Sequence, residues 1–113
     1  MTCDVWQVVV VPFPFTERAT TKRRPALVLS ARTFNRRGYS VLAMITSASH
    51  QPWPGDTPIE NLKAAGLKTS SLVRLKLFTL DNRFIVRRAG TLGSPDQASV
   101  AARLRAALPA LAA

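Results

Sequence analysis

The sequence predicts a mainly β protein with α content: a small barrel of short strands with one C-terminal helix packed on it. Short β-branched runs separated by prolines and glycines, one helix signal near the end and a length of 113 residues carry this prediction. Because 47% of the residues are hydrophobic, the chain has enough apolar surface for a core of its own. We therefore expect residues 1–113 to form a single domain.

The strand candidates are rich in β-branched or aliphatic side chains, and turn-forming residues separate them. Prolines end the first of them, because proline cannot donate to a sheet ladder. A polar loop is expected over residues 16–24, a turn over 32–38, a proline-rich loop over 47–58 and a short helical turn within 59–66. The strands themselves are expected at residues 5–12, 25–30, 39–46, 71–80 and 84–92.

The helix signal begins at Ser94-Pro95-Asp96-Gln97, which offers an N-cap, a proline at the first helical position, an acid in the first turn and a capping-box glutamine. Apolar residues then recur at helical spacing, and Arg103 and Arg105 fall beside them. The apolar stripe consists of Val100, Ala101, Leu104, Ala107, Leu108 and Leu111. One face of this helix should lie on the sheet, which predicts an SH3-like barrel with a helix packed on it.

Charge is the strongest compositional signal, because 16 Lys and Arg residues against 6 Asp and Glu give a net charge of +10 and an isoelectric point near 11.5. Most of the basic residues are arginine, whose planar fork binds phosphate through two hydrogen bonds. Two interpretations remain open: the basic surface of a protein from an arginine-rich genome, or a surface that binds nucleic acid or an acidic protein. Both partners could share one face.

The compartment is indicated by several small signals. The single cysteine, Cys3, cannot form an internal disulfide, which favours a reducing environment. The longest apolar run, residues 8–15, contains two prolines, whereas a spanning helix needs about 20 apolar residues. The N-terminus lacks the basic and apolar regions of a secretory signal. We therefore expect a cytoplasmic protein with no membrane partner.

The residue content of the chain disfavours several classes of catalytic site. The six carboxylates are scattered along the chain, and one cysteine with one histidine does not suit a zinc site, so neither a metal nor a cofactor is expected. No glycine-rich phosphate-binding motif and no nucleophile elbow is present. RNA, however, carries its own nucleophile in the 2′-hydroxyl, and arginines with a well-placed hydroxyl can position and stabilise its attack on the adjacent phosphorus. This composition therefore permits a metal-free ribonuclease.

Six short blocks occur in the order, and with roughly the spacing, of one known family. They are Val-Val-Val-Pro-Phe-Pro-Phe-Thr (9–16), Lys-Arg-Arg-Pro-Ala-Leu-Val-Leu-Ser (22–30), Ala-Met-Ile-Thr-Ser (43–47), Trp-Pro-Gly-Asp (53–56), Ala-Ala-Gly-Leu (64–67) and Lys-Leu-Phe-Thr-Leu-Asp (76–81). Together they resemble the PemK/MazF toxins, or mRNA interferases, of type II toxin–antitoxin systems. The resemblance covers about residues 8–92.

This resemblance implies a PemK/CcdB-type barrel, a homodimer, and a sequence-selective endoribonuclease that cuts single-stranded mRNA without metal. Attack by the 2′-hydroxyl would leave a 2′,3′-cyclic phosphate and a 5′-hydroxyl. The resemblance also implies a cognate antitoxin, whose acidic disordered segment would lie across the basic groove. The family's catalytic arginine corresponds to Arg24, and its catalytic threonine corresponds to Thr46.

We expect Arg24 to clamp the scissile phosphate and to act as an acid toward the leaving oxygen, because arginine stays protonated. Glu17 or His50 is expected to take the 2′-proton. The residues expected to bind RNA are Phe15, Thr16, Lys22, Arg23, Ser47, His50, Trp53 and Arg74, of which the two aromatic residues could instead cap the barrel core. Arg87 and Arg88 either contact phosphates as well or form a solvated strand face.

Some positions depart from the family pattern or stay ambiguous within it. Trp6-Gln7 stands where relatives often carry Gly-Asp, and Phe78 stands where some branches carry a second arginine, for which Arg74 is a candidate substitute. Asp81 either matches an aspartate of the pattern or simply ends a strand. Two rival functions also remain open: a non-enzymatic toxin on the same fold, such as a CcdB-type gyrase poison, and a passive RNA-binding barrel.

Overall fold

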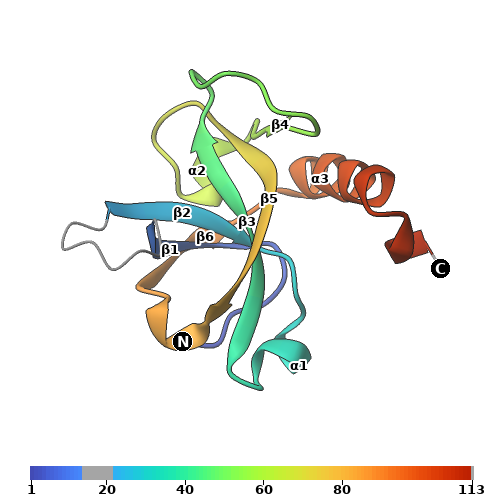
Figure 1. Cartoon of the computed structure of the whole chain (residues 1–113). Helices are drawn as coiled ribbons and strands as arrows, with labels where there is room; N and C mark the ends of the chain where they lie inside the picture. The colour runs from blue at the N-terminus through green and yellow to red at the C-terminus, as the bar shows by residue number, and fades with distance from the viewer. Residues whose placement is uncertain (14–21, 113) are drawn as a thin grey trace.

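The computed structural model describes residues 1–13 and 22–112. Six strands form one curled sheet in the order β4-β5-β3-β2-β1-β6, and each neighbouring pair is antiparallel (Figure 1). The strands are β1 (Gln7–Phe13), β2 (Lys22–Val28), β3 (Tyr39–Ser47), β4 (Thr57–Pro58), β5 (Ser71–Asp81) and β6 (Arg87–Thr91). The helical segments are α1 (Arg32–Asn35), α2 (Leu62–Ala65), η1 (Asn82–Phe84), α3 (Ser94–Ala107) and η2 (Pro109–Ala112).

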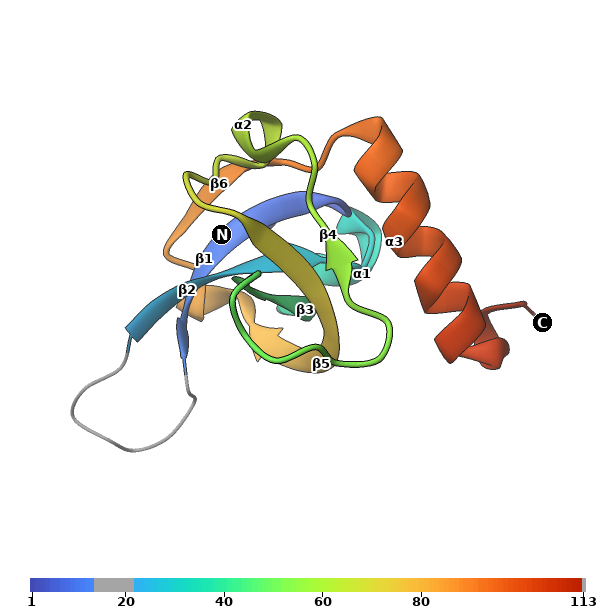
Figure 2. The same ribbon diagram turned by 90° about the horizontal axis from the view of Figure 1, so that it is seen from above.

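Helix α3 lies beside the curled sheet near the C-terminus, as Figure 2 shows from above. The predicted class, a small mainly β barrel with a C-terminal helix, is therefore confirmed, with the sheet curled into half of a barrel. The structure adds detail at three places: the turn over residues 32–38 contains α1, the loop over 47–58 ends in β4, and η1 precedes β6. No described helix is both long enough and apolar enough to cross a membrane.

Strand β2 begins earlier than the sequence predicts, because Pro25 is accommodated inside it. Directly after β2, Leu29 donates its backbone N–H to Val41 of β3, so the backbone groups of odd-numbered residues such as Pro25 face β3. The ladder with β3 starts only at Ala26, so β2 has no hydrogen-bonded neighbour on that side at Pro25. The N–H that proline lacks would therefore have had no partner in the ladder. Arg24 is consequently held in the sheet, opposite Val11 of β1.

Strand residues alternate between two apolar layers, one on each side of the sheet. The side that we call the α3 side carries residues that pack with Val100 and Leu104 of α3: Val8, Leu27, Ala43, Ile45 and Val73. The other, which we call the Cys3 side, carries residues that pack with Cys3: Val9, Val11, Ala26, Val28 and Leu42. Because side chains alternate along a strand, Arg24 joins Ala26 on the Cys3 side, whereas Arg23 joins Leu27 on the α3 side.

The start of α3 differs from its prediction. The helix begins at Ser94 itself, its N-cap is Gly93, and no side chain caps it, so the predicted Ser94 cap and capping box are wrong. Asp96 is buried instead, and its carboxylate accepts the backbone N–H groups of Glu60 at 3.1 Å and Asn61 at 3.0 Å. The first turn of α3 thus fixes the segment before α2, because its polar group bonds across the interface rather than within the helix.

The apolar stripe of α3 is buried only in its first half. Val100 and Leu104 belong to the core, whereas Leu108 and Leu111 expose 37% and 57% of their surface. The expectation that one face of the helix lies on the sheet is thus confirmed for the first half alone. The second half leaves apolar surface uncovered beside the sheet.

The turn before β1 has a backbone conformation that is typical of glycine. Trp6 has φ of 70°, a left-handed conformation that side chains other than glycine rarely adopt. Its backbone donates to Val28 and accepts from Leu92, both at 2.8 Å, and its ring packs against the α3-side core. The tryptophan therefore occupies a position where glycine would be unstrained.

Candidate functional site

Arg24 and Thr46 lie beyond the end of the ladder between β2 and β3, which pairs only Ala26 with Met44, Leu27 with Ala43 and Val28 with Leu42. Alternation along β2 places Arg24 on the same side of the sheet as Ala26, and alternation along β3 places Thr46 on the same side as Leu42. Both side chains therefore lie on the Cys3 side, Arg24 half-buried and Thr46 with 8% of its surface exposed. The two residues that are expected to be catalytic thus share one side of the sheet, each two positions beyond the ladder.

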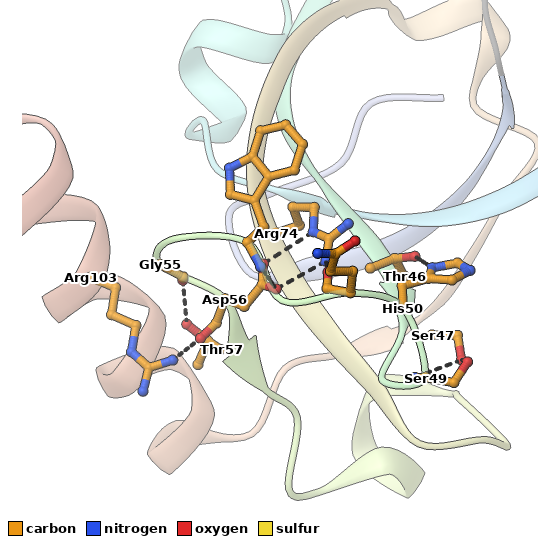
Figure 3. A network of polar contacts seen from close by, with 11 residues as sticks. Thr46, Ser47, Ser49, His50, Gly55, Asp56, Thr57, Arg74 and Arg103 are labelled. Carbon is orange, nitrogen blue, oxygen red and sulfur yellow. Dashed lines mark hydrogen bonds and ion pairs between the residues drawn. The ribbon is translucent and has the colours of Figure 1, made fainter.

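The Thr46 hydroxyl is hydrogen-bonded to a histidine. Its Oγ1 lies 2.6 Å from Nδ1 of His50, which follows β3 in an exposed loop (Figure 3). Histidine is the side chain that most readily takes and returns a proton near neutral pH. The pair therefore connects a buried hydroxyl on the strand with an exposed acid–base group. Beside it, the hydroxyls of Ser47 and Ser49 are 2.9 Å apart.

Arg74 of β5 holds the loop between β3 and β4 in place (Figure 3). Its Nε and Nη2 donate to the two carboxylate oxygens of Asp56 at 3.1 and 3.0 Å, and Nη2 also donates to the carbonyl of Gln51 at 2.9 Å. The two charged side chains expose only 13% and 12% of their surface. The ring of Trp53 lies over the Arg74 guanidinium at 5.3 Å, and Arg103 of α3 donates to the Asp56 carbonyl.

Arg74 and Asp56 each stabilise the charged form of the other. Burial acts to raise the pKa of Asp56, but hydrogen bonds from Arg74 and from the backbone N–H of Trp53 outweigh it, so the pKa lies below its ordinary 3.8. The hydrogen bond to Asp56 likewise raises the pKa of Arg74. Both groups therefore stay charged at neutral pH, and the loop that carries His50 is braced by a bidentate ion pair. Arg74 thus has a positioning role that the sequence did not indicate.

The other residues expected to bind RNA lie in different parts of the structure. Lys22 and Arg23 are exposed at the start of β2 on different sides of the sheet, and Ser47 is exposed at the end of β3. Trp53 exposes 42% of its surface and lies over Arg74 and Lys76, so it covers the loop brace instead of the barrel core.

Three of the predicted site residues, Phe15, Thr16 and Glu17, lie outside the described residues. Asp81 lies opposite Tyr39, at the end of the β3–β5 ladder remote from Thr46. Its carboxylate accepts the backbone N–H of Arg83 at 2.9 Å and forms an ion pair with the same residue, so it acts as a turn residue.

Sequence reasoning missed the role of Asp56, although the residue belongs to the Trp-Pro-Gly-Asp block. Its partner Arg74 is 18 positions away, and nothing in the spacing joins them. Within the described part of the chain, no group of three or more His, Cys, Asp or Glu side chains is close enough to hold a metal ion.

Substitution of Asp56 tests whether its ion pair with Arg74 stabilises the loop between β3 and β4. Asp56→Asn should lower the free energy of unfolding at neutral pH by about 2 kcal/mol, because it leaves a largely buried guanidinium without its counter-charge. The folded-state pKa of Asp56 is lowered, so the pair contributes fully above pH 3.8 and loses its contribution as the pH falls through the folded value. Chemical denaturation at pH 7 and at progressively lower pH should therefore show the difference between native and variant shrinking in acid.

The matched control is Asp81→Asn, because the Arg83 side chain that pairs with Asp81 is 82% exposed. Exposed pairs contribute little, so this change should cost less than Asp56→Asn. Equal stability of Asp56→Asn and the native chain at pH 7 would show that the ion pair does not brace the loop.

Comparison with known proteins agrees with this architecture. A family model described as the PemK-like, MazF-like toxin of type II toxin–antitoxin systems matches residues 4–108. A chain of the MazE–MazF crystal structure (Form-III) from Deinococcus radiodurans matches with a TM-score of 0.77 and 22% identity, over 96% of this chain and 98% of that chain. MazF (Form-I) from the same organism matches with a TM-score of 0.75 and 21% identity, over 96% and 98%.

A further structure, described as an endoribonuclease in complex with its cognate antitoxin from Mycobacterial species, matches with a TM-score of 0.74 and 16% identity over 95% of each chain. A search of curated proteins found no match. At such identities the solved structures establish the fold, whereas the family model spans most of the sequence. The chain therefore belongs to the PemK/MazF toxin family of type II toxin–antitoxin systems.

Proposed function

We propose that the chain is a metal-independent, sequence-selective endoribonuclease that acts on single-stranded mRNA in the cytoplasm. The observation that carries the proposal is that Arg24 and Thr46 share one side of the sheet, each two positions beyond the ladder between β2 and β3. Guanidinium and hydroxyl groups are the donors that a phosphate in the course of transfer requires. The similarity to a mycobacterial chain described as an endoribonuclease supports the same reaction class.

In the proposed reaction, the 2′-oxygen of the RNA attacks the adjacent phosphorus and the bond from phosphorus to the 5′-oxygen breaks. The proton of the 2′-hydroxyl passes to the Thr46–His50 pair, whose atoms are 2.6 Å apart. Arg24 stabilises the charge on the phosphorane and gives a proton to the leaving oxygen. The products are a 2′,3′-cyclic phosphate and a 5′-hydroxyl, and DNA is not cut because it lacks the nucleophile.

An acidic, disordered segment of a cognate antitoxin is the proposed inhibitor. The chain carries a net charge of +10, and within the described residues only three arginines form ion pairs: Arg32, Arg74 and Arg83. A flexible acidic segment can follow the remaining basic surface and exclude RNA from it. One similar structure is described as an endoribonuclease in complex with its cognate antitoxin and another as MazE–MazF, which supports this kind of partner.

A homodimer through the exposed half of α3 is part of the proposal. An apolar groove of about 270 Å³ lies between α3 and the sheet, and its walls include Leu29, Val41, Leu77, Leu108 and Leu111. Three of these leucines are exposed: Leu77 by 37%, Leu108 by 37% and Leu111 by 57%. A second copy would present the same leucines, and two-fold pairing of like surfaces would cover both grooves at once.

Cleavage of a long single-stranded RNA in EDTA tests the proposed activity. The native protein should cut at discrete sites and leave 5′-hydroxyl ends, which end mapping detects. Arg24→Ala should slow cleavage by about a hundredfold or more, because it removes the charge opposite the phosphorane. Arg36→Ala is the matched control, since this exposed arginine ends α1 and should leave the rate unchanged.

The rival functions give different results in that assay. Salt-dependent RNA binding without cleavage by the native protein would favour the passive RNA-binding barrel. Neither binding nor cleavage would favour a non-enzymatic toxin such as a gyrase poison.

The role of His50 is tested by removing its side chain and adding a soluble base. His50→Ala should slow cleavage by about a hundredfold, because it removes the proton acceptor beside Thr46. Added imidazole should restore part of the rate, because it replaces the missing proton acceptor. Ser49→Ala in the same loop is the control, and an unchanged cleavage rate in His50→Ala would exclude this assignment.

The proposed dimer is tested by the molar mass in solution. Sedimentation equilibrium should give about twice the 12.3 kDa of one chain for the native protein. Leu108→Glu combined with Leu77→Glu should give the monomer mass, since two charges would be buried at the interface. Phe84→Glu changes another exposed apolar residue outside the groove and should leave the dimer intact. A monomeric native protein would contradict the proposal.

A further inference from the structure

Helix α2 is joined to β6 by a close contact between two backbones. Gly66, which follows α2, has φ of 73°, and a Cβ there would overlap the carbonyl oxygen of Ala89. A Cβ at Gly90 would in turn overlap the carbonyl oxygen of Ala64. Only glycine at both positions permits this approach. The segment after α2 is therefore fixed directly over β6, where Figure 2 shows α2 and β6 side by side.

This contact forms one wall of a groove on the α3 side of the sheet. The groove has a volume of about 350 Å³, and β1, β2 and β6 form its floor and its other wall. Val10 of β1 is opposite Pro25 of β2 and opposite Arg87 of β6, so all three side chains point to the same side. Arg23 precedes Pro25 by two residues and shares that side. Leu67 completes the groove from the α2 wall.

Two guanidinium groups thus flank an apolar floor. Arg23 and Arg87 are both exposed, and neither forms an ion pair with any carboxylate among residues 1–13 and 22–112. Paired arginines over an aliphatic surface suit a phosphodiester with its attached sugar or base, because the forks bind phosphate oxygens and the floor accepts the apolar part. The arrangement is a binding site built from three strands and α2.

We propose that this groove binds a phosphodiester of single-stranded RNA next to the cleavage site, held by Arg23 and Arg87. The groove adjoins that site because Arg24 also lines it, and Arg23 and Arg24 occupy neighbouring positions of β2. Because Arg24 points to the Cys3 side and the groove lies on the α3 side, a strand whose scissile phosphate lies at Arg24 reaches the groove across the edge of β2 that is unpaired at Pro25. The identity of the polymer rests on the proposed function, whereas the anion-binding geometry does not.

The choice of RNA over an acidic peptide follows from this continuity. An antitoxin segment requires only a basic surface, whereas RNA bound for cleavage must continue on both sides of the scissile phosphate. The apolar lining of the groove, which includes Val10, Pro25 and Leu67, also suits a sugar or base better than it suits a run of carboxylates.

Neighbouring arginines of β6 provide a matched test. Arg87 lies opposite Val10 in the groove, whereas Arg88 lies opposite Val9 on the Cys3 side, and both are exposed. Arg87→Ala and Arg88→Ala therefore remove the same charge from opposite sides of the sheet. Binding of a mixed-sequence single-stranded 2′-O-methyl RNA, which cannot be cleaved, should be measured by fluorescence anisotropy over a series of salt concentrations.

Arg87→Ala should weaken binding about tenfold at low salt and reduce the slope of log affinity against log salt by about 0.7, as expected for one lost phosphate contact to a single strand. Arg23→Ala should behave in the same way, whereas Arg88→Ala should weaken binding less, because it leaves both arginines of the groove in place. Arg36→Ala, at an exposed arginine after α1, should bind like the native protein. Arg87→Gln serves as a second variant that removes the charge but keeps a polar side chain, and thermal unfolding checks that each variant is folded.

Equal losses for Arg87→Ala and Arg88→Ala would overturn the proposal, because they would show a diffuse effect of charge. An Arg87-dependent affinity for a poly-aspartate peptide, without any Arg87 dependence for the RNA, would overturn it in favour of an acidic protein segment. A third result would contradict the proposed function but not the binding groove. In that case the native protein would leave RNA uncut in EDTA but would still bind the 2′-O-methyl strand through Arg87.

Discussion

The register of β2 between its two neighbours is the constraint on which the functional surfaces depend. Pairing with β1 places Arg24 opposite Val11, and pairing of Ala26 with Met44 in β3 leaves Arg24 on the same side of the sheet as Thr46. A slip of one residue would move every side chain of β2 to the other side of the sheet. Arg24 would then leave Thr46, and Arg23 would leave the groove beside Arg87. The apolar alternation of Ala26 and Val28 with Leu27 makes such a slip costly, because it would exchange residues of two different cores.

The second constraint is the brace between Arg74 and Asp56, which acts on a loop that has little secondary structure of its own. Buried ion pairs carry a desolvation cost, so their contribution to stability is small unless the hydrogen bonds are complete. Here the carboxylate accepts two bonds from Arg74 and one from the backbone of Trp53. The same guanidinium reaches the carbonyl of Gln51, directly after His50. The brace therefore fixes the position of the histidine relative to Thr46 more than it adds to overall stability.

The sequence predicted what depends on local patterns and missed what depends on distant pairs. The β-branched runs located every strand of the sheet except β4, and the helical stripe located α3, because periodicity is a property of neighbouring residues. Arg24 and Thr46 were predicted as catalytic residues by resemblance alone, since a basic run and a strand end have no distinctive spacing. Asp96 looked like an ordinary first-turn acid, but it bonds to the backbone of Glu60 and Asn61 across an interface that only the folded chain creates. Trp6 shows the converse, because its backbone follows a turn that its own residue type disfavours.

The order of the strands also explains how dimerisation and RNA binding can coexist on a chain of this size. The apolar groove involves β5 and the second half of α3, whereas the arginine groove involves β1, β2 and β6. In the order β4-β5-β3-β2-β1-β6, Leu77 and Arg87 lie toward opposite edges of the same sheet. A second copy seated on the leucines therefore leaves Arg87 accessible to a polyanion. Hydrophobic contact at one edge and charge at the other need not compete, since each surface uses different strands of the sheet.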